Sequence, residues 1–361
     1  MIHLDMSQNK FSNSFLYMNY YLIIEMLEYG NLLVTMVYLN LLLLCWQGSE
    51  AIYGKGIKQL PLSIGLQTEL EKLLLAPCEF ENLPESIKIL PRLRHLDLRG
   101  CRKLQSLPVL PSLLKTLDAS DCISLKTVTF PSANLQMLKE NKKMVAFWNC
   151  LKLDEPSLQA IGLNAHINMM NFALKHVSTF VHDYDSQATY VYPGNSVPEW
   201  LKYRTTGDSL TVDLSFTKQH SFDHLDFIVG FIVPEIALQG SILRFNIAIG
   251  EGEGDNIQVY LGRTSHGIQF DHVYLMCNQN LSHSLRNRFK NQSTLEIRIT
   301  MESGTLTSEY VPLKQLKGFG ISPINTSQDN LLADDFTTRV LIASALLIVC
   351  GTLWARRVGI I

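Results

Sequence analysis

Histidine and aspartate side chains gather at two places where together they could hold a metal ion. Residues 182–185 read His-Asp-Tyr-Asp, and residues 220–226 contain two histidines and two aspartates. Imidazole and carboxylate groups ligate zinc, but a structural site needs about four ligands that converge from fixed positions. The first cluster has no second pair of ligands, and the second falls where a loop between strands is expected. Exposed loops explain both clusters better, so we expect no metal and no cofactor.

The motifs of common enzyme classes do not occur in the sequence. There is no G-x-S-x-G turn for a nucleophilic serine and no C-x-x-C pair. A phosphate-binding G-x-x-x-x-G-K-[ST] loop is also missing, since Gly54-Lys55-Gly56 lacks its spacing. Glycan hydrolysis needs paired carboxylates, and none stand in a strand context. These observations predict a protein that is not an enzyme.

A leucine pattern recurs along residues 70–125. The structure that this pattern forms determines where the residues between the leucines lie. The unit L-x-x-L-x-L-x-x-C begins at Leu70, returns 23 residues later at Leu93, and returns in degraded form 21 residues after that at Leu114. A period of 20–29 residues with this spacing is typical of a leucine-rich repeat, in which each L-x-L is a short strand. The prolines inside the pattern exclude a continuous helix. We therefore predict a solenoid of α/β repeats.

Side chains that alternate with the buried leucines are predicted to form the exposed strand surface of the solenoid. A solenoid of this kind offers that surface to partners. The candidate partner-contact residues are Lys72, Leu74, Arg94, His95, Asp97, Lys115, Thr116 and Asp118.

The seven cysteines fit the repeat better than a disulfide framework. Cys78, Cys101 and Cys122 hold the last position of the repeat unit, and Cys150 has the phase of a fourth. An odd number of cysteines at core positions predicts reduced thiols in a cytosolic setting. The net charge of −2 implies no general attraction to nucleic acid.

The period changes after the repeats. Residues 154–181 have helical spacing, and from Thr189 onward short apolar runs alternate with polar residues. About eight such runs, separated by turns rich in glycine and aspartate, predict a β-sandwich of the jelly-roll or immunoglobulin type. Trp200 is expected either beneath the opening strand or as a binding aromatic.

One motif in this second part resembles a known family. Residues 192–212 read YPGNSVPEWLKYRTTGDSLTV, and Phe147-x-Asn149-Cys150-x-x-Leu153 precedes them. Together with the repeats, they resemble the C-terminal part of plant TIR-type nucleotide-binding leucine-rich-repeat disease-resistance proteins. The family prefers Phe at the position of Leu201. The matching motif residues, taken as mainly structural, are Pro193, Gly194, Val197, Pro198, Trp200, Tyr203, Arg204, Gly207 and Ser209.

The resemblance implies a non-enzymatic protein-recognition module of plant innate immunity, like the effector-sensing half of a receptor. Its expected partner is a protein, either a pathogen effector or a nucleotide-binding receptor domain. The TIR domain and the nucleotide-binding loop have no counterpart in the sequence. The alternative is a truncated or decayed paralogue that acts as a regulatory decoy or has no activity of its own.

Two apolar stretches raise the question of a membrane. Residues 31–46 fit either a degenerate repeat or a short span, and we favour the repeat. Residues 340–355 carry no charge between Arg339 and Arg356, and Trp354 lies near one end. At about 1.5 Å per residue a helix of this length spans about 24 Å, close to a hydrocarbon core. We therefore predict a C-terminal transmembrane helix and a tail-anchored protein with cytosolic domains.

The predicted order of domains follows from these patterns. It comprises a degenerate repeat region (1–47), leucine-rich repeats with their cap (48–153), a helical linker (154–188), the β-sandwich (189–323), a polar linker (324–339) and the transmembrane helix (340–355).

Overall fold

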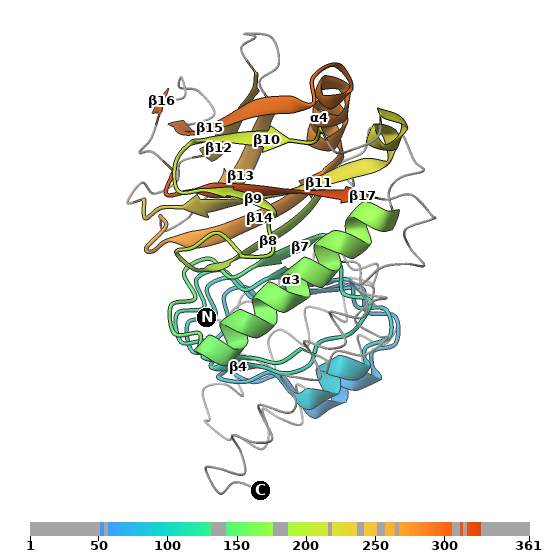
Figure 1. Cartoon of the computed structure of the whole chain (residues 1–361). Coiled ribbons are helices and arrows are strands. Elements are labelled where there is room, and N and C mark those ends of the chain that lie inside the picture. The colour runs from blue at the N-terminus through green and yellow to red at the C-terminus, as the bar shows by residue number, and fades with distance from the viewer. Residues whose placement is uncertain are drawn as a thin grey trace, which may run out of the picture. The chain divides into compact units, whose positions relative to one another are not determined.

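The computed structural model describes ten stretches of the chain (Figure 1). They are residues 51–53, 57–130, 142–175, 187–215, 219–236, 242–250, 257–263, 267–304, 311–312 and 316–325. The predicted degenerate region (1–47) and the predicted transmembrane segment (340–355) lie outside them.

The chain divides into two compact units. The first, the repeat unit, comprises Met1–Phe130, Lys142–Ile161 and Val191–Pro193. The second, the β unit, comprises Pro131–Asn141, Gly162–Tyr190 and Gly194–Ile361. The helix α3 (Glu155–Lys175) and the strand β8 (Gln187–Pro193) each contribute residues to both units.

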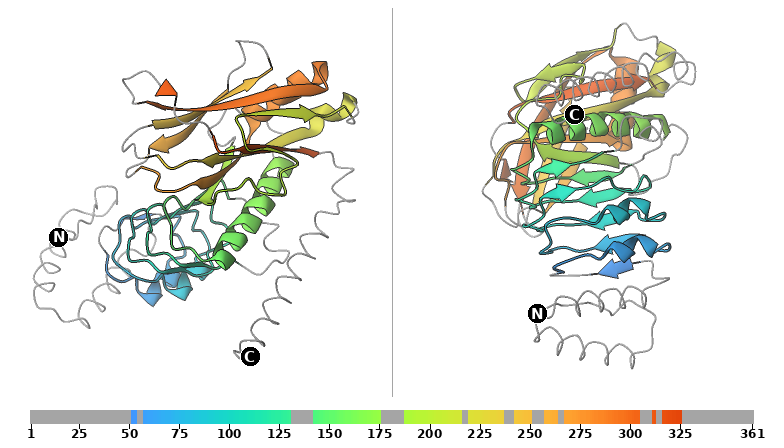
Figure 2. Two further views of the ribbon diagram at one scale, coloured as in Figure 1. Left: turned by 60° about the vertical axis from the view of Figure 1, so that its left-hand side comes forward. Right: turned by 90° about the horizontal axis from the view of Figure 1, so that it is seen from below.

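Parallel strands run side by side through the repeat unit (Figure 2). They are β1 (Ala51–Tyr53), β2 (Lys72–Leu74), β3 (His95–Asp97), β5 (Thr116–Asp118) and β7 (Met144–Ala146). The register pairs Leu73 with Leu96, Leu96 with Leu117, and Leu117 with Val145. These four side chains are at most 1% exposed, so the repeated leucines lie beneath the strands and fix which residues face outward.

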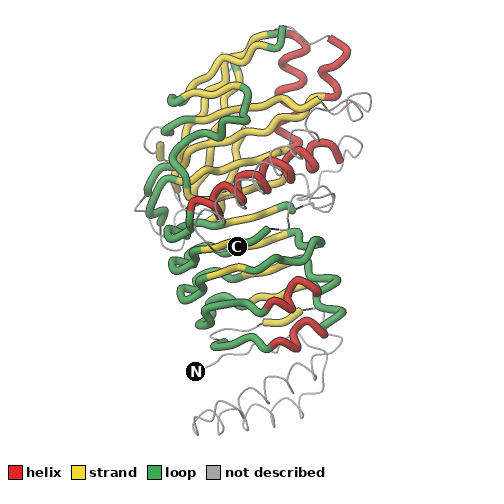
Figure 3. The backbone as a smooth tube through the Cα atoms, turned by 60° about the horizontal axis from the view of Figure 1, so that its bottom comes forward, coloured by secondary structure: helices red, strands yellow, loops and turns green. Residues whose placement is uncertain are grey.

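The other side of the repeats corrects the predicted fold class, because its described residues (57–130) form no α-helix. Two repeats have one 3-10 turn each, η1 (Leu62–Leu66) and η2 (Glu85–Ile89), and the next two have the paired short strands β4 (Ser106–Leu107) and β6 (Thr127–Val128) (Figure 3). Pro61 and Pro84 directly precede the turns. A repeat of 21–23 residues interrupted by proline has no room for a longer helix.

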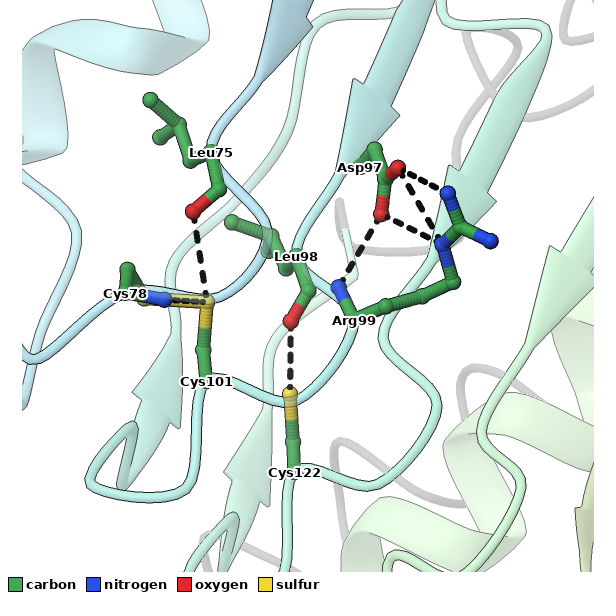
Figure 4. Close-up of a disulfide and its surroundings, with 7 residues drawn as sticks. All are labelled: Leu75, Cys78, Asp97, Leu98, Arg99, Cys101 and Cys122. Carbon is green, nitrogen blue, oxygen red and sulfur yellow. Dashed lines mark hydrogen bonds and ion pairs between the residues drawn. A yellow bond between two sulfur atoms is a disulfide. The ribbon is translucent and has the colours of Figure 1, made fainter. Parts of the chain in front are cut away.

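The cysteines of the repeats correct the prediction of reduced thiols. Cys78 and Cys101 form a disulfide across neighbouring repeats (Figure 4). Cys122 and Cys150 are free and buried, and each thiol donates to a carbonyl of the preceding repeat: Cys122 to Leu98 O at 3.2 Å and Cys150 to Ala119 O at 3.0 Å. Burial raises the pKa of the Cys122 thiol to about 12, so it stays protonated and able to donate.

Helix α3 begins at a side-chain cap. Asp154 accepts a hydrogen bond from Ser157 N–H at 2.9 Å, and Ser157 Oγ in turn accepts one from Val128 N–H at 2.9 Å. An aspartate at this position satisfies backbone donors that a helix leaves open. Farther along the helix, within the β unit, Asn164 is fully buried and accepts from the Tyr190 hydroxyl at 3.0 Å.

Two sheets and the helix α4 (Gln279–Asn291) form the β unit. The first sheet has the order β14-β11-β17-β9, that is His272–Asn278, Leu225–Val233, Phe319–Asn325 and Tyr203–Thr205. The second has the order β10-β15-β12-β13, that is Ser209–Asp213, Thr294–Gly304, Ile242–Ile249 and Ile257–Arg263, and β16 (Val311–Pro312) also pairs with β15. The 3-10 turn η4 (Gln219–His224) leads into β11.

Aromatic side chains join the layers of the β unit. Phe231 of β11 lies 4.2 Å from Phe245 of β12 between ring centroids, and both rings are within 6.0 Å of Tyr274. On α4, Phe289 stacks against Phe227 of β11, so the helix is fixed to the first sheet by an aromatic contact.

The predicted transmembrane helix and tail-anchored localisation are corrected as well. No helix in the described part of the chain is long and apolar enough to span a membrane. Its two α-helices show why: α3 has 21 residues but buries Asn164, Asn168 and Asn171, and α4 has 13 residues and carries Arg286 and Lys290. Most of the described elements are strands, and the fold class is that of a β-rich chain.

Candidate functional site

The strands of the repeat unit align the predicted contact residues in rows. The register places Lys72, His95, Thr116 and Met144 in one row. A second row contains Leu74, Asp97 and Asp118. Lys72 is exposed, and the other members of both rows are half-buried. We call these two rows, with the row described next, the strand face.

A third row lies one residue before the strands. Arg94 N–H donates to Glu71 O, Lys115 N–H to Arg94 O, and Lys143 N–H to Lys115 O, at 2.7–2.8 Å. This backbone ladder places Glu71, Arg94, Lys115 and Lys143 side by side. The three rows together contain all eight predicted contact residues. The sequence reasoning missed Lys143 and Met144 on the fourth strand, although the phase of Val145 and Cys150 was a signal for them.

His95 is the central residue of the basic part of this face. Its Nδ1 lies 2.9 Å from Thr116 Oγ1, a hydrogen bond between neighbouring strands. Burial and the positive charges of Lys72, Lys115 and Arg94 lower the pKa of His95 below its usual 6.5, and Glu71 opposes them. A pKa below 6.5 leaves His95 mainly neutral at pH 7.

The acidic part of the face is held by an arginine that sequence reasoning missed. Arg99 binds Asp97 through two nitrogens, at 2.7 Å for Nη2 to Oδ2 and 3.0 Å for Nε to Oδ1, as Figure 4 shows. Its Nε is also 3.7 Å from Asp118 Oδ2. Burial raises the pKa of Asp118, while hydrogen bonds from Ser120 act in the opposite direction. Arg99 thus joins the carboxylates of two strands.

The motif residues of the β unit build a tight packing arrangement. Gly230 and Gly320 are directly opposite each other on β11 and β17. A Cβ on either would come within 3.1 Å of Leu201 Cδ1, and one on Gly320 would lie 2.8 Å from Val197 Cγ1. The side chains of Val197 and Leu201 therefore rest on bare backbone. Leu201, the departure from the family pattern, fills this position and is fully buried.

The remaining motif residues shape turns. Arg204 donates to Glu199 O and, at 3.1 Å, to Leu201 O, which closes the turn begun at Pro198. The Tyr203 hydroxyl donates to Asp213 O, and Gly207 N–H to Thr205 Oγ1 at 3.1 Å. Pro193 ends β8, Gly194 N–H donates to Asp271 O at 3.0 Å, and Ser209 begins β10 opposite Arg298.

Trp200 stacks on a histidine of α3. The ring centroids of Trp200 and His166 are 4.2 Å apart and their planes differ by 6°. Trp200 is half-buried, and burial lowers the pKa of His166 to about 4. Trp200 is therefore not fully buried beneath the opening strand, and its part in binding stays a prediction.

The two aspartates of the second metal candidate, residues 220–226, are engaged elsewhere. Asp223 pairs with Lys290, and Asp226 pairs with Arg286 at 3.0 Å, so both carboxylates belong to ion pairs around α4. Within the described stretches no group of three or more His, Cys, Asp or Glu side chains could hold a metal ion. Residues 182–185 lie outside those stretches.

The chain is similar to disease-resistance proteins of Arabidopsis thaliana. It is 33% identical over 158 residues to disease resistance-like protein DSC1. The aligned region covers 43% of this chain and 13% of DSC1. It is 37% identical over 147 residues to disease resistance protein RML1B (41% and 12%), and 34% identical over 134 residues to disease resistance protein RPS4 (37% and 11%). No family model matches the chain.

These relatives confirm the resemblance to TIR-type nucleotide-binding leucine-rich-repeat disease-resistance proteins that the motifs predicted. The matched part of the chain spans only about an eighth of the length of these relatives.

Proposed function

We propose that this chain is a non-enzymatic protein-recognition module of plant immunity and that the strand face is its contact surface. The observation that carries this proposal is the register, which aligns Lys72, His95, Thr116 and Met144 across four strands. Neighbouring strands lie about 4.8 Å apart, so four of them present a continuous row about 14 Å long. The relatives named as disease-resistance proteins support the immune context.

Rigidity favours this surface as a binding site. The leucines beneath it are fully buried, and hydrogen bonds tie its polar residues together across strands, as between His95 and Thr116. A surface that is ordered before binding loses little conformational entropy when a partner arrives. The expected partner is a pathogen effector or a nucleotide-binding receptor domain.

The experiment compares two identical substitutions on different sheets. Thr116→Arg places a long side chain in the centre of the strand face. Thr127→Arg places the same side chain on β6, which pairs with β4 in another sheet of the same repeats. Thr127 is exposed. Tagged wild-type and variant chains are expressed in leaf tissue, and co-purifying proteins are quantified by mass spectrometry.

We expect a protein that is retained by the wild type and by Thr127→Arg and is lost with Thr116→Arg. Equal melting temperatures of the two variants exclude misfolding as the cause. If both variants retain the same proteins in the same amounts, the strand face is not the contact surface.

The alternative function, a regulatory decoy, would use the same surface and differ in its effect. A decoy would lower the immune response of a full-length receptor when co-expressed with it, and Thr116→Arg would abolish that effect. This alternative stays a prediction.

A further inference from the structure

The sulfur of Cys101 occupies a site that recurs in the next two repeats. Cys101, Cys122 and Cys150 stand at the same position of successive repeats, one repeat after Cys78. The backbone N–H of Cys78 donates to Cys101 Sγ at 3.1 Å. In the same way a backbone hydrogen bond runs from Cys101 to the Cys122 sulfur, and another from Cys122 to the Cys150 sulfur. Each sulfur therefore lies beside the cysteine amide of the repeat before it.

Each of these sulfurs also faces a backbone carbonyl of the preceding repeat. The free thiols of Cys122 and Cys150 donate to such a carbonyl at 3.2 and 3.0 Å. The corresponding carbonyl for Cys101 is Leu75 O, which lies 4.0 Å from Cys101 Sγ (Figure 4). A reduced Cys101 thiol would thus find the same donor and the same acceptor that the next two repeats provide for their thiols. Reduction therefore leaves this buried sulfur with partners.

We propose that the Cys78–Cys101 bond is a reversible redox link, which glutathione opens and oxidised glutathione closes while the repeats stay folded. The next two repeats support the open state, because each holds a buried free thiol at the same position. Each repeat of a solenoid contacts only its neighbours. The link therefore controls how readily the repeats before it, which contain β1 and β2, separate from those after it.

The exchange begins at Cys78. Cys78 is 5% exposed and Cys101 is fully buried, so the thiolate of glutathione reaches Cys78 Sγ first. A new S–S bond forms there, the Cys78–Cys101 bond breaks, and Cys101 leaves as a thiolate with the electron pair. The amide of Cys78, 3.1 Å away, stabilises this charge until the sulfur takes up a proton.

A second glutathione completes the reduction. Its thiolate attacks the glutathione sulfur of the mixed disulfide, and Cys78 leaves as a thiolate and is protonated. The protein gains two electrons and two protons, and two glutathione molecules become one molecule of oxidised glutathione. The reverse sequence closes the link.

The test equilibrates the full chain, without denaturant, in glutathione buffers that range from fully reduced to fully oxidised. Free thiols are alkylated after acid quenching and denaturation, and peptide mapping then gives the oxidised fraction of Cys78 and Cys101. Circular dichroism of the same samples reports the fold. Hydrogen exchange, measured by mass spectrometry, compares residues 57–78, before the link, with residues 95–128, after it.

We expect the oxidised fraction to fall as glutathione increases and to return when oxidised glutathione is added. Circular dichroism should not change. Reduction should make hydrogen exchange in residues 57–78 about 10–100-fold faster, because the constraint of the closed loop is lost. Residues 95–128 should change by less than about twofold, since their contacts with neighbouring repeats remain.

Two alanine variants serve as controls. Cys78→Ala removes the bond, and its exchange in residues 57–78 should match that of the reduced wild type in every buffer. Cys122→Ala removes a thiol from the equivalent position two repeats later and should keep the wild-type response to glutathione.

The inference is wrong if excess glutathione opens the bond only in denaturant, or if oxidised glutathione fails to close it or joins other cysteines instead. It is also wrong if reduction abolishes the circular dichroism of the folded chain. Equal exchange rates of residues 57–78 in the two redox states would contradict it as well.

Discussion

At the scale of single residues, packing around glycine explains the motif of the β unit. A Cβ on Gly318 would lie 2.5 Å from Thr205 O, and the φ angle of this residue is +148°. Gly207 belongs to the motif itself, yet a Cβ there would meet nothing closer than Thr205 Oγ1 at 3.6 Å. Gly318 is therefore required by a close backbone approach and a positive φ angle, whereas Gly207 has room for a methyl group. Substitution by alanine tests this difference.

We expect Gly318→Ala to lower the free energy of unfolding by about 2–4 kcal/mol, because it combines a backbone clash with a strained φ angle. Gly207→Ala should change it by less than about 0.5 kcal/mol. Denaturant unfolding of both variants measures the difference. A loss of stability in Gly207→Ala as large as that in Gly318→Ala would contradict this explanation.

His166 makes stability depend on pH. Its pKa is about 4 in the folded chain and 6.5 when unperturbed, so the unfolded chain binds a proton that the folded chain does not. Stability is therefore complete above pH 6.5 and falls as the pH drops toward 4, by up to about 3 kcal/mol.

Replacing His166 by phenylalanine removes this titration and keeps a ring opposite Trp200. We expect the stability of His166→Phe to fall less steeply than that of the wild type between pH 6.5 and pH 4, the range set by the two pKa values. Denaturant melts at several pH values measure the two slopes, and equal slopes would show that His166 is not responsible.

The sequence predicted which residues of the repeat strands are buried, but it did not predict the side-chain contacts between strands or elements. The leucine period determined which residues lie buried, and the residues between them were therefore outward by alternation. Arg99 was not identified because its two carboxylate partners lie on different strands, and their distance depends on the register. The stack of His166 on Trp200 joins residues 34 positions apart that share no motif.

At the scale of elements, the disulfide joins two repeats that the sequence treats as equivalent. Its cysteines are 23 residues apart. On a chain-entropy basis, closing a loop of this length stabilises the folded state by about 3 kcal/mol. The sequence predicted reduced thiols because the number of cysteines is odd and their positions are buried. Neither property shows that the sulfurs of Cys78 and Cys101 are adjacent.

We expect peptide mapping after alkylation in denaturant, without reductant, to find Cys78 and Cys101 unmodified and joined. Reductant should then lower the free energy of unfolding by about 3 kcal/mol in the wild type, and should have no such effect in Cys101→Ala. Cys122→Ala serves as the control and should keep the response to reductant. Alkylated Cys78 in the untreated chain would contradict the disulfide.

Helix α4 was not predicted, although its sequence carried the signal. Leu281, Leu285 and Phe289 recur at helical spacing, and all three are buried. Asn278 accepts from Leu281 N–H at 2.9 Å and caps the first turn. Residues 279–291 lie between two segments with strand alternation. A search for period-two alternation therefore interprets the helix as a loop.

An ion pair fixes α4 on the first sheet. Arg286 donates to Asp226 Oδ1 at 3.0 Å and to Leu225 O at 2.9 Å, and the Asp226 side chain is only 6% exposed. We expect Arg286→Ala to lower the free energy of unfolding by about 3–5 kcal/mol, since it removes a charge partner of a buried carboxylate.

Lys290→Ala is the matched control, because it breaks a pair in which the partner, Asp223, is 63% exposed. We expect a change of at most about 1 kcal/mol there. Similar losses in thermal or denaturant melts of the two variants would show that burial does not distinguish these ion pairs.

At the scale of the whole molecule, one surface carries the proposed function. The strand face collects basic residues at one end and acidic residues at the other, and the relatives place similar sequences in disease-resistance proteins. The tail anchor predicted from residues 340–355 is corrected by the finding that no helix of the described residues could span a membrane.

The most direct measurement of the central claim is site-specific photo-crosslinking in leaf tissue. A photoreactive phenylalanine analogue replaces Thr116 on the strand face in one chain and Thr127 on β6 in another. We predict a discrete adduct with a protein partner from position 116 and none from position 127. Adducts of the same mass and yield from both positions, or an adduct from position 127 alone, would contradict the claim that the strand face is the contact surface.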